Sequence, residues 1–521
     1  MEENNKRIFD VTKRDFLFTA LIFLAAVFGV FFGIFNGFHF GFTLTSFVTF
    51  VCLTVYLSKG VRKIKKFPLA CGILALGLSA VFSVTSNGSV RFLGFVGTVI
   101  LSLIWFVSLS DIPFKPGDGG LISTIFSPVF EQTLPNIPTT VTSLFSHKEN
   151  VGKTIGKIAI GVAIAVPVLA VVIPLLMSSD AAFSGLVGSI SGNLFMIAFK
   201  IGLALAITIV LLSYCFSLKK DSVNDKPVSQ FAGVDNVILS SFLFVLSICY
   251  LLYLFSQLAY FFSAFKGILP SDYTFTLSEY ARRGFFEMCV ISVINLITVY
   301  VVLSIAKRNH GKLPMILRII CTFISVFSLV IIGTALSKMI LYINHLGMTE
   351  LRITTSSFMV FLAVVFAFLI FKVYIPKAEV LRAAVVTAGI VLILLGTVNV
   401  NRFVAEYNYQ AYTAGKLETI DVQQIYSLGD EGIPYLLRLT QDADTNVKKQ
   451  AKDFLLACIE NEKYYDIEVE YSDDKPVFKV GDRKCKNIGE YTISKMMAYN
   501  VLDEFIENNV NEINTYLADK L

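Results

Sequence analysis

The feature that most constrains this chain is a series of apolar runs, each about 20 residues long and bounded by charged or turn-forming segments. A helix needs about 20 apolar residues to cross the roughly 30 Å hydrocarbon core of a bilayer, and inside lipid the backbone must satisfy its own hydrogen bonds. The sequence therefore predicts an all-α polytopic membrane bundle with about 11 transmembrane helices. The expected spans are Phe16–Phe35, Phe38–Leu57, Phe67–Ser86, Phe92–Leu109, Ile158–Met177, Leu194–Phe216, Asn236–Phe262, Phe285–Ala306, Ile319–Ile343, Ile353–Tyr374 and Ala383–Val398.

The Lys and Arg residues of the connecting segments are distributed unevenly between the two sides of the expected membrane. Alternate segments carry 23 Lys and Arg on one side and 6 on the other. Because the cytoplasmic loops of membrane proteins are enriched in these residues, residues 1–15 are expected to form a cytoplasmic N-terminal segment. An odd number of spans then places the C-terminus on the extracytoplasmic side of the cell membrane.

Residues 16–400 are the expected transmembrane domain, in which one connection is much longer than the others. This connection, residues 110–157, contains five prolines among apolar residues. Proline removes a backbone donor and disrupts a spanning helix. An interfacial loop is therefore expected here, and a gate or re-entrant element is the alternative.

Residues 401–521 differ in composition from the rest of the chain. From Phe403 onward there are 13 Lys and Arg against 22 Asp and Glu, and the continuous apolar runs end. We therefore expect a small soluble α+β domain on the extracytoplasmic side. Within it, the helical spacing over Asp421–Glu460 resembles a HEAT-like helical hairpin, which must pack on another element. Alternation over Tyr465–Val480 predicts a β-hairpin, and an amphipathic helix is expected over Gly489–Leu521.

The sequence lacks the common signatures of enzymes, such as a Gly-rich phosphate loop or a His-Glu-x-x-His motif. The four histidines lie in different loops, so no metal site and no cofactor are expected. Topology explains the basic excess of the membrane part, so no nucleic-acid partner is expected. The expected partners are the lipid bilayer and a protein bound through the C-terminal domain. Cys458 and Cys485 are candidates for a disulfide, because the extracytoplasmic side is oxidising.

The candidate site is a set of ionisable and amide side chains near the outer ends of the spans. Charges in hydrocarbon are costly and are usually functional or paired. Glu279, Arg283 and Glu287 are four residues apart, where each acid can pair with the arginine. The set is either a ligand-binding cluster or a group of interfacial salt bridges that hold helix ends. Its members are Asp180, Lys200, Gln257, Glu279, Arg282, Arg283, Glu287, Lys338 and Arg352.

Several of these residues occur in stretches that resemble a bacterial family of membrane proteins. The stretches are Ser178–Phe183, Gln257–Tyr260, Glu279–Glu287, Leu341–Tyr342, Gly347–Arg352, Ala405–Asn408 and Gly415–Glu418. Over residues 158 to about 439 the chain is similar to the domain-of-unknown-function family 4173 and to its relative 4153. That family has no established activity, so the resemblance implies a multi-pass membrane protein without a defined substrate.

Three classes of function remain open from the sequence. The first is a sensor or scaffold that binds a ligand, a lipid or a protein partner at its outer face. The second is a transporter or channel with an outward-facing polar site. Asn295 lies in the middle of a span, but the chain has no convincing internal repeat, which favours the first class. The third is a membrane enzyme acting on lipid or cell-wall precursors, with Asp180 and Glu279 or Glu287 as its acid and base.

Overall fold

The computed structural model describes residues 9–35, 39–58, 64–110, 112, 117–144, 172, 192–220, 234–266, 285–308, 312–460, 464–472, 475–483 and 491–520. The chain falls into two units. Unit 1 covers Met1–Val84, Gly88–Asp225 and Cys485–Ile493. Unit 2 covers Thr85–Asn87, Lys226–Lys484 and Ser494–Leu521.

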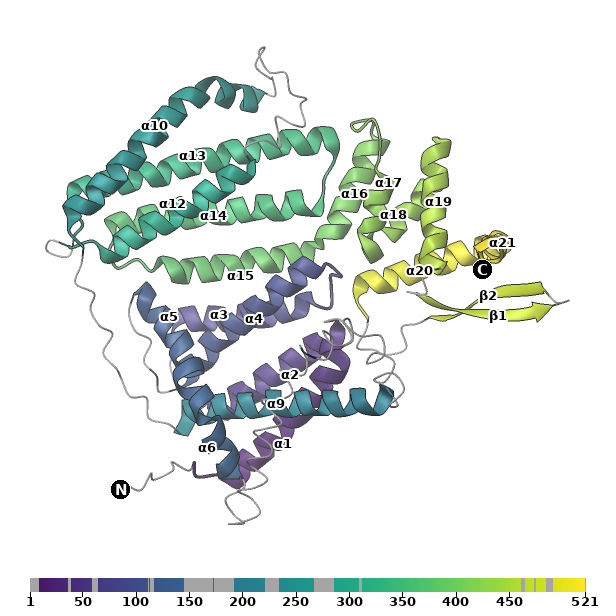
Figure 1. Ribbon diagram of the computed structural model, residues 1–521, viewed down its shortest axis with the longest axis horizontal. Helices are drawn as coiled ribbons and strands as arrows, with labels where there is room; N and C mark the ends of the chain where they lie inside the picture. Colours follow the sequence, from purple (N-terminus) through teal and green to yellow (C-terminus); the bar gives the residue numbers. More distant parts are fainter. Residues whose placement is uncertain are drawn as a thin grey trace. The chain divides into compact units, whose positions relative to one another are not determined.

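Unit 1 consists of helices throughout the part that the structure describes (Figure 1). A capping box starts its first helix, because the Thr12 hydroxyl accepts a hydrogen bond from the Asp15 backbone N–H and the Asp15 carboxylate accepts one from the Thr12 backbone N–H at 2.8 Å. Asp15 also accepts a 2.6 Å hydrogen bond from the Tyr56 hydroxyl, which links α1 to α2. The helices are α1 (Lys13–Phe28), η1 (Gly29–Ile34), α2 (Phe40–Leu57), α3 (Lys66–Val81), α4 (Gly88–Leu109), α5 (Asp118–Ser127), η2 (Pro128–Thr133), α6 (Leu134–Leu144) and α9 (Gly192–Lys220).

The long connection expected at the interface is helical from Asp118 to Leu144. The π-helical turn η2 begins at Pro128, which has no backbone N–H to donate, and the Thr133 hydroxyl donates a 2.7 Å hydrogen bond to the Pro128 carbonyl. Neither α5 nor α6 is among the candidate membrane-spanning helices of the described residues. The interfacial location of this segment stays a prediction.

Unit 2 contains five long apolar helices, which run side by side in Figure 1. Helix α13 contacts α10, α12 and α14, and α14 contacts α15. Buried Leu, Ile, Val and Phe side chains fill the space between these helices. The helices are α10 (Asn236–Lys266), α12 (Phe285–Ile305), α13 (Met315–Leu346), α14 (Glu350–Tyr374) and α15 (Val380–Val398).

Nine helices in the described part of the chain are long and apolar enough to cross a membrane. They correspond to nine of the eleven expected spans, and α3 corresponds to the third. Helix α3 has only 16 residues, because the expected span ends in a turn at residues 82–84 rather than continuing to Ser86. The expected fifth span, residues 158–177, lies outside the described residues except for Val172.

The C-terminal part of unit 2 is built from short helices and one β-hairpin. As the spacing predicts, residues 421–460 are helical, and their regularly spaced Leu, Ile and Val side chains are largely buried. The predicted hairpin is confirmed, with β1 (Tyr465–Ser472) antiparallel to β2 (Lys475–Arg483). The helices are α16 (Val400–Thr413), α17 (Val422–Ser427), η3 (Gly429–Glu431), α18 (Ile433–Leu439), α19 (Thr445–Glu460), α20 (Ile493–Asn508) and α21 (Val510–Lys520).

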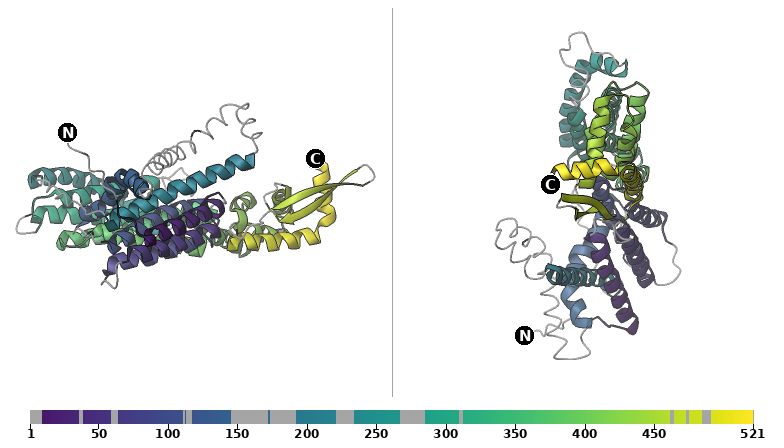
Figure 2. Two further views of the ribbon diagram at one scale, coloured as in Figure 1. Left: turned by 90° about the horizontal axis from the view of Figure 1, so that it is seen from below. Right: turned by 90° about the vertical axis from the view of Figure 1, so that its right-hand side faces the viewer.

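The last expected helix is divided in two at Asn509. Its side-chain amide donates a 2.8 Å hydrogen bond to the Phe505 carbonyl near the end of α20, and its own carbonyl accepts from Ile513 at 3.0 Å in α21. Asn favours helix ends, because its short polar side chain can bond to the nearby backbone. Figure 2 shows the hairpin beside α20 and α21, and β2 contacts α21.

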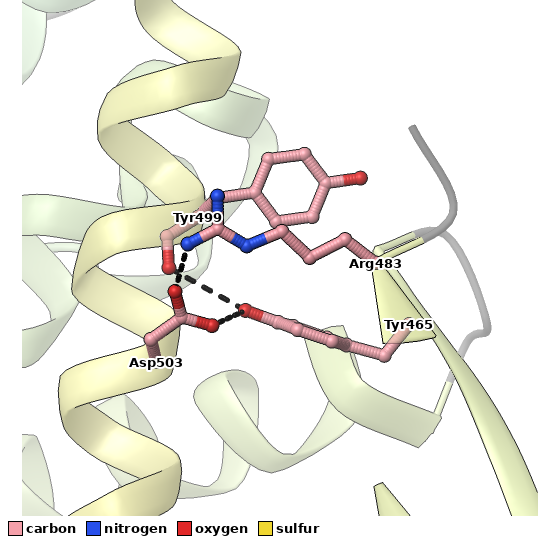
Figure 3. A network of polar contacts seen from close by, with 4 residues as sticks. All are labelled: Tyr465, Arg483, Tyr499 and Asp503. Carbon is pink, nitrogen blue, oxygen red and sulfur yellow. Dashed lines mark hydrogen bonds and ion pairs between the residues drawn. The ribbon is translucent and has the colours of Figure 1, made fainter. Parts of the chain in front are cut away.

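A polar network fixes the base of the hairpin to α20 (Figure 3). The Asp503 carboxylate accepts a 2.6 Å hydrogen bond from the Tyr465 hydroxyl and forms an ion pair with Arg483. The Arg483 guanidinium also lies 5.1 Å from the centre of the Tyr499 ring. Both strands are thereby connected to the same helix, so a hairpin that is too small to be stable alone is held by side-chain contacts.

Candidate functional site

The turn between α13 and α14 is built around Gly347 and Met348. Gly347 has φ 74° and ψ −178°, a conformation that is accessible essentially to glycine alone. The Asn408 side chain, from α16, bonds both polar groups of the Met348 backbone: its Oδ1 accepts from the N–H at 2.6 Å and its Nδ2 donates to the carbonyl at 2.8 Å. Helix α16 therefore holds the turn that ends one membrane helix and begins the next.

Arg352 lies at the start of α14, and its side chain hydrogen-bonds to carbonyls at the C-terminal end of α13. Its guanidinium donates to the carbonyls of Leu346, at 3.1 Å, and of Gly347, and it lies 4.0 Å from the centre of the Tyr342 ring. The last carbonyls of a helix have no partner within that helix, and a cation near them is favourable. Arg352 therefore stabilises the turn through contacts within the chain.

A cavity of about 680 Å³, here called the turn cavity, opens beside this turn. The α13–α14 turn and the segment from α16 to α17 form its wall, and the Gln424 side chain crosses between them by donating a 2.7 Å hydrogen bond to the Met348 carbonyl. The lining residues are His345, Leu346, Gly347, Thr349, Arg352, Asn408, Lys416, Leu417, Glu418, Thr419, Ile420, Asp421 and Gln424.

The turn cavity carries charges of both signs. Asp421 is engaged in the fold, because its carboxylate accepts a 2.9 Å hydrogen bond from the Gln424 N–H and caps α17. Lys416 and Glu418 are exposed and two residues apart in the segment before α17. A cavity with one lysine and one glutamate at its wall is chemically suited to a polar molecule that carries both a negative and a positive group.

A second cavity, of about 290 Å³ and here called the acidic cavity, lies between α16, η3, α18 and α20. Its lining includes the carboxylates of Glu406, Asp430 and Glu431 and the guanidiniums of Arg402 and Arg438. It therefore also combines groups of both signs, and it lies wholly within unit 2.

Glu406 and Tyr435 form a hydrogen-bonded pair at the edge of the acidic cavity. The Tyr435 hydroxyl donates to the Glu406 carboxylate, which lowers the pKa of Glu406 below its ordinary value. Burial and this same hydrogen bond raise the pKa of Tyr435 to about 12. At neutral pH the pair therefore consists of a carboxylate and a neutral phenol.

Of the predicted site residues, the structure brings Glu287 and Lys338 together. Lys338 is only 7% exposed in α13, and the Glu287 carboxylate, from α12, is near enough to interact with its ammonium group. Arg352 is in the same unit but makes the turn contacts given above. The buried lysine is thus accompanied by an acid, as expected for a charge within a membrane helix.

The other predicted site residues are dispersed or are not described. Lys200 belongs to unit 1, where its Nζ lies 5.2 Å from the centre of the Phe31 ring and 4.9 Å from that of Phe35. Gln257 lies in α10, of which only the backbone is described at that point. The residues outside the described part are Asp180, Glu279, Arg282, Arg283 and Cys485, whereas Cys458 is buried in α19.

Most residues of the two cavities are not marked out by any pattern in the sequence. Asn408, Lys416 and Glu418 are distinguished only as parts of stretches that resemble a family. Those stretches were nevertheless the useful signal, because Gly347–Arg352, Ala405–Asn408 and Gly415–Glu418 contribute residues to the wall of the turn cavity. Asp430 and Glu431 follow a glycine in what reads as an ordinary turn, so the sequence offers no sign that they are buried.

A family described as a domain of unknown function (DUF4153) matches residues 70–439. This is the second of the two related families named above, and the match begins earlier in the chain than the resemblance did. No curated protein and no solved structure matches the chain. The matched region ends at the last residue of α18, so it includes the whole turn cavity.

Proposed function

The chain belongs to the DUF4153 family of domains of unknown function, and from that premise we propose that it is a multi-pass membrane sensor or scaffold that binds a ligand in the turn cavity. The observation that carries this proposal is the cavity of about 680 Å³ at the α13–α14 turn. Its volume is in the range of small-molecule sites, about 300–1,000 Å³.

The charges at the wall indicate the chemistry of the ligand. Lys416 can pair with a phosphate or carboxylate, and Glu418 can pair with an ammonium group, so a zwitterion would engage both. The cavity adjoins the ends of two candidate membrane spans. The ligand class is therefore a phosphoethanolamine-like zwitterion, as a free molecule or as a lipid headgroup.

A ligand in this cavity would contact two elements that side-chain hydrogen bonds join, the α13–α14 turn and the C-terminal helices. Asn408 and Gln424 are the side chains that join the α13–α14 turn to the C-terminal helices. A ligand that binds one arrangement of these elements more tightly shifts the population toward it. This supports a role as a sensor, in which occupancy of the cavity changes how the C-terminal helices are presented to a protein partner.

The alternative functions receive less support from the described residues. The Asn295 side chain accepts a 2.5 Å hydrogen bond from Tyr250 and donates one of 2.9 Å to Ser328, so a polar residue in mid-span is used to join three helices. Glu287, a candidate acid or base for an enzyme, interacts with buried Lys338. Both arrangements favour structural roles over transport or catalysis.

The test uses the full-length protein in nanodiscs of phosphatidylcholine and measures its thermal midpoint. Soluble phosphoethanolamine should raise the midpoint if the ligand is a free zwitterion, and phosphatidylethanolamine in the disc should raise it if the ligand is a headgroup. Lys416→Gln should abolish the rise, whereas Lys448→Gln, at an exposed position on α19, should retain it. If neither compound stabilises the wild-type protein, this function is wrong.

We also propose that all eleven expected spans cross the membrane, with a cytoplasmic N-terminus and residues 401–521 as an extracytoplasmic domain. The nine candidate spans and the alternating basic segments support this topology. The mutual packing of α17, α18 and α19 supports the HEAT-like hairpin within that domain. A C-terminal reporter that is active only in the cytoplasm would contradict the orientation.

The remaining proposal for the domain is a bridge between Cys458 and Cys485. In the denatured protein, where burial no longer protects Cys458, a maleimide should label neither cysteine before reduction and both after reduction. Rapid labelling of both before reduction would exclude the disulfide.

A further inference from the structure

Two methionines near the N-terminal end of α20, here called the methionine pair, are exposed at the surface of unit 2. Met496 is 53% exposed and Met497 is 40% exposed, whereas the next two side chains, Ala498 and Tyr499, are buried. One face of the helix therefore packs on the protein while the methionine pair remains uncovered. Exposed apolar side chains that occur together mark surfaces that contact a protein, a ligand or a membrane.

Two side-chain contacts locate the methionine pair beside the last candidate span. The Asn399 amide donates a 2.7 Å hydrogen bond to the hydroxyl of Ser494, two residues before Met496. The Arg402 guanidinium donates to the Met497 sulfur at 3.7 Å. Asn399 directly follows α15, and Arg402 lies three residues later, within the first turn of α16. The methionine pair is therefore next to the C-terminal end of α15.

The length of α15 indicates the depth of that end in a bilayer. Its 19 residues span about 28 Å at 1.5 Å per residue, which nearly equals the roughly 30 Å of the hydrocarbon core. Leu394 and Val398, four residues apart on one face, are exposed, as expected for side chains that contact lipid. If α15 crosses the membrane, Val398 lies close to the hydrocarbon boundary.

Arg402 and the methionine pair then fall at the level of the lipid headgroups. One helical turn rises about 5.4 Å, and the headgroup layer on each side of the bilayer is roughly 5 to 7 Å thick. Arg402 is exposed and lies less than one turn beyond Asn399. An exposed arginine beside apolar side chains at this level is suited to the lipid phosphates, because its aliphatic stem can follow the apolar surface.

The charges along α20 support the same orientation. Lys495 is the single charged residue in 493–502, whereas the acids Asp503, Glu504 and Glu507 follow in the second half of the helix. Figures 1 and 2 show α20 extending away from the long apolar helices of unit 2. Anionic lipids attract Lys and Arg close to the membrane surface and repel acids. The N-terminal end of α20 is thus the end that is compatible with a membrane surface.

We propose that the N-terminal end of α20 is an additional membrane contact, in which the methionine pair enters the boundary between headgroups and acyl chains of a phospholipid bilayer. The Arg402 guanidinium pairs with lipid phosphates beside it. Apolar side chains at an interface of this kind insert about 5 to 10 Å, a depth that the flexible methionine side chains can follow. The inference rests on the proposed crossing of the membrane by α15.

The experiment measures tryptophan fluorescence of full-length variants in phosphatidylcholine nanodiscs, with or without bromine near the headgroup end of the acyl chains. Bromine quenches only the tryptophans that lie close to it. Trp105 is the one native tryptophan, so its emission, measured on the wild type in the same discs, is subtracted. Met496→Trp should lose at least half of its emission in the brominated discs. Glu507→Trp, exposed on the same helix and about 16 Å further along it, should keep its emission.

Two further variants separate this inference from the crossing of α15. Leu394→Trp, on the exposed face of α15, should be quenched by the brominated lipid, and Met497→Trp serves if Met496→Trp does not fold. Quenching at Leu394 without quenching at the methionine pair overturns the inference and leaves the crossing intact. Absence of quenching at all of these positions overturns both.

Soluble acrylamide, which quenches tryptophans from the water phase, identifies any other cover. A tryptophan in the methionine pair that neither acrylamide nor brominated lipid quenches is covered by protein, such as a second copy of the chain, and this result overturns the membrane contact. Equal quenching of Met496→Trp and Glu507→Trp by brominated lipid also overturns it, because the contact would then not be confined to the N-terminal end of α20.

Discussion

Asn408 and Met348 form a closed pair in which one side-chain amide satisfies both the N–H and the carbonyl of one backbone residue, at 2.6 Å and 2.8 Å. Asn408→Ala leaves both backbone groups buried without this partner, at a cost of about 1 to 3 kcal/mol. Asn408→Asp keeps the acceptor and loses the donor, so it should fall between the wild type and the alanine variant. Denaturant unfolding in detergent measures the order. Asn511→Ala, on an exposed part of α21, is the control.

Gly347 and Gly415 provide a matched comparison of backbone strain. Both have positive φ, at 74° and 69°, but an added Cβ at Gly347 would lie 2.8 Å from Asn408 Oδ1, whereas at Gly415 it would meet nothing within 4 Å. Gly415→Ala should therefore cost only the backbone strain, roughly 1 to 2 kcal/mol. Gly347→Ala adds displacement of Asn408 and should cost more. Equal loss of thermal stability in the two variants would mean that the turn tolerates movement of Asn408.

Tyr250, Asn295 and Ser328 hold three helices of unit 2 together. Interhelical hydrogen bonds of this kind contribute about 0.6 kcal/mol on average in membrane bundles. Tyr250→Phe and Ser328→Ala should each lower stability by about this amount, and a double-mutant cycle through Asn295 should show coupling. Ser304→Ala, whose hydroxyl bonds only within its own helix at an exposed position, is the control. Loss of ligand stabilisation without loss of folding stability would instead indicate a polar pathway.

The hydrogen bond from Tyr435 to Glu406 predicts a pH dependence. Because the pKa of Glu406 is lower in the folded state than its ordinary value of 4.5, its contribution to stability is present above that value and is lost as the pH falls through the folded-state pKa. The difference in thermal midpoint between wild type and Tyr435→Phe should therefore be largest near pH 7 and shrink toward pH 3. A difference that is constant over this range would assign the effect of the hydroxyl to packing alone.

The apolar runs predicted the membrane helices well, because the length needed to cross hydrocarbon is a property of local sequence. The hairpin was equally predictable, because its two alternating segments flank a turn, whereas its register, with Ile467 opposite Val480 and Val469 opposite Phe478, comes from the structure. The turn cavity depends instead on Asn408 reaching Met348 across 60 residues of sequence. Such a contact follows from helix packing, which the pattern of apolar residues leaves undefined.

The predicted polar cluster shows the same limit. Four-residue spacing indicates which charges share a helix face, but it gives no information about other helices. Glu287 and Lys338 both belong to the predicted set because each is a charge near the outer end of a span, and in the structure the Glu287 charge is close enough to act on the Lys338 ammonium. Lys200, selected by the same reasoning, lies against two aromatic rings in the other unit. The sequence indicates which charges belong to the ends of expected spans, whereas their neighbours on other helices depend on packing.

The junction at Asn399 has a mechanical consequence. Helix α15 ends at Val398 and α16 begins at Val400, so a single residue with φ 54° separates the last candidate span from the C-terminal helices. The side chain of this residue caps α16 through the Arg402 N–H and donates to Glu431 and Ser494. A flexible linker would allow α15 to tilt without moving α16. A junction of one residue whose side chain is hydrogen-bonded on both sides instead transmits a tilt of α15 to α16 as a rotation. A change in bilayer tension or thickness that tilts the last span would thereby move α16, whose residues line both cavities, and change the shape of those cavities.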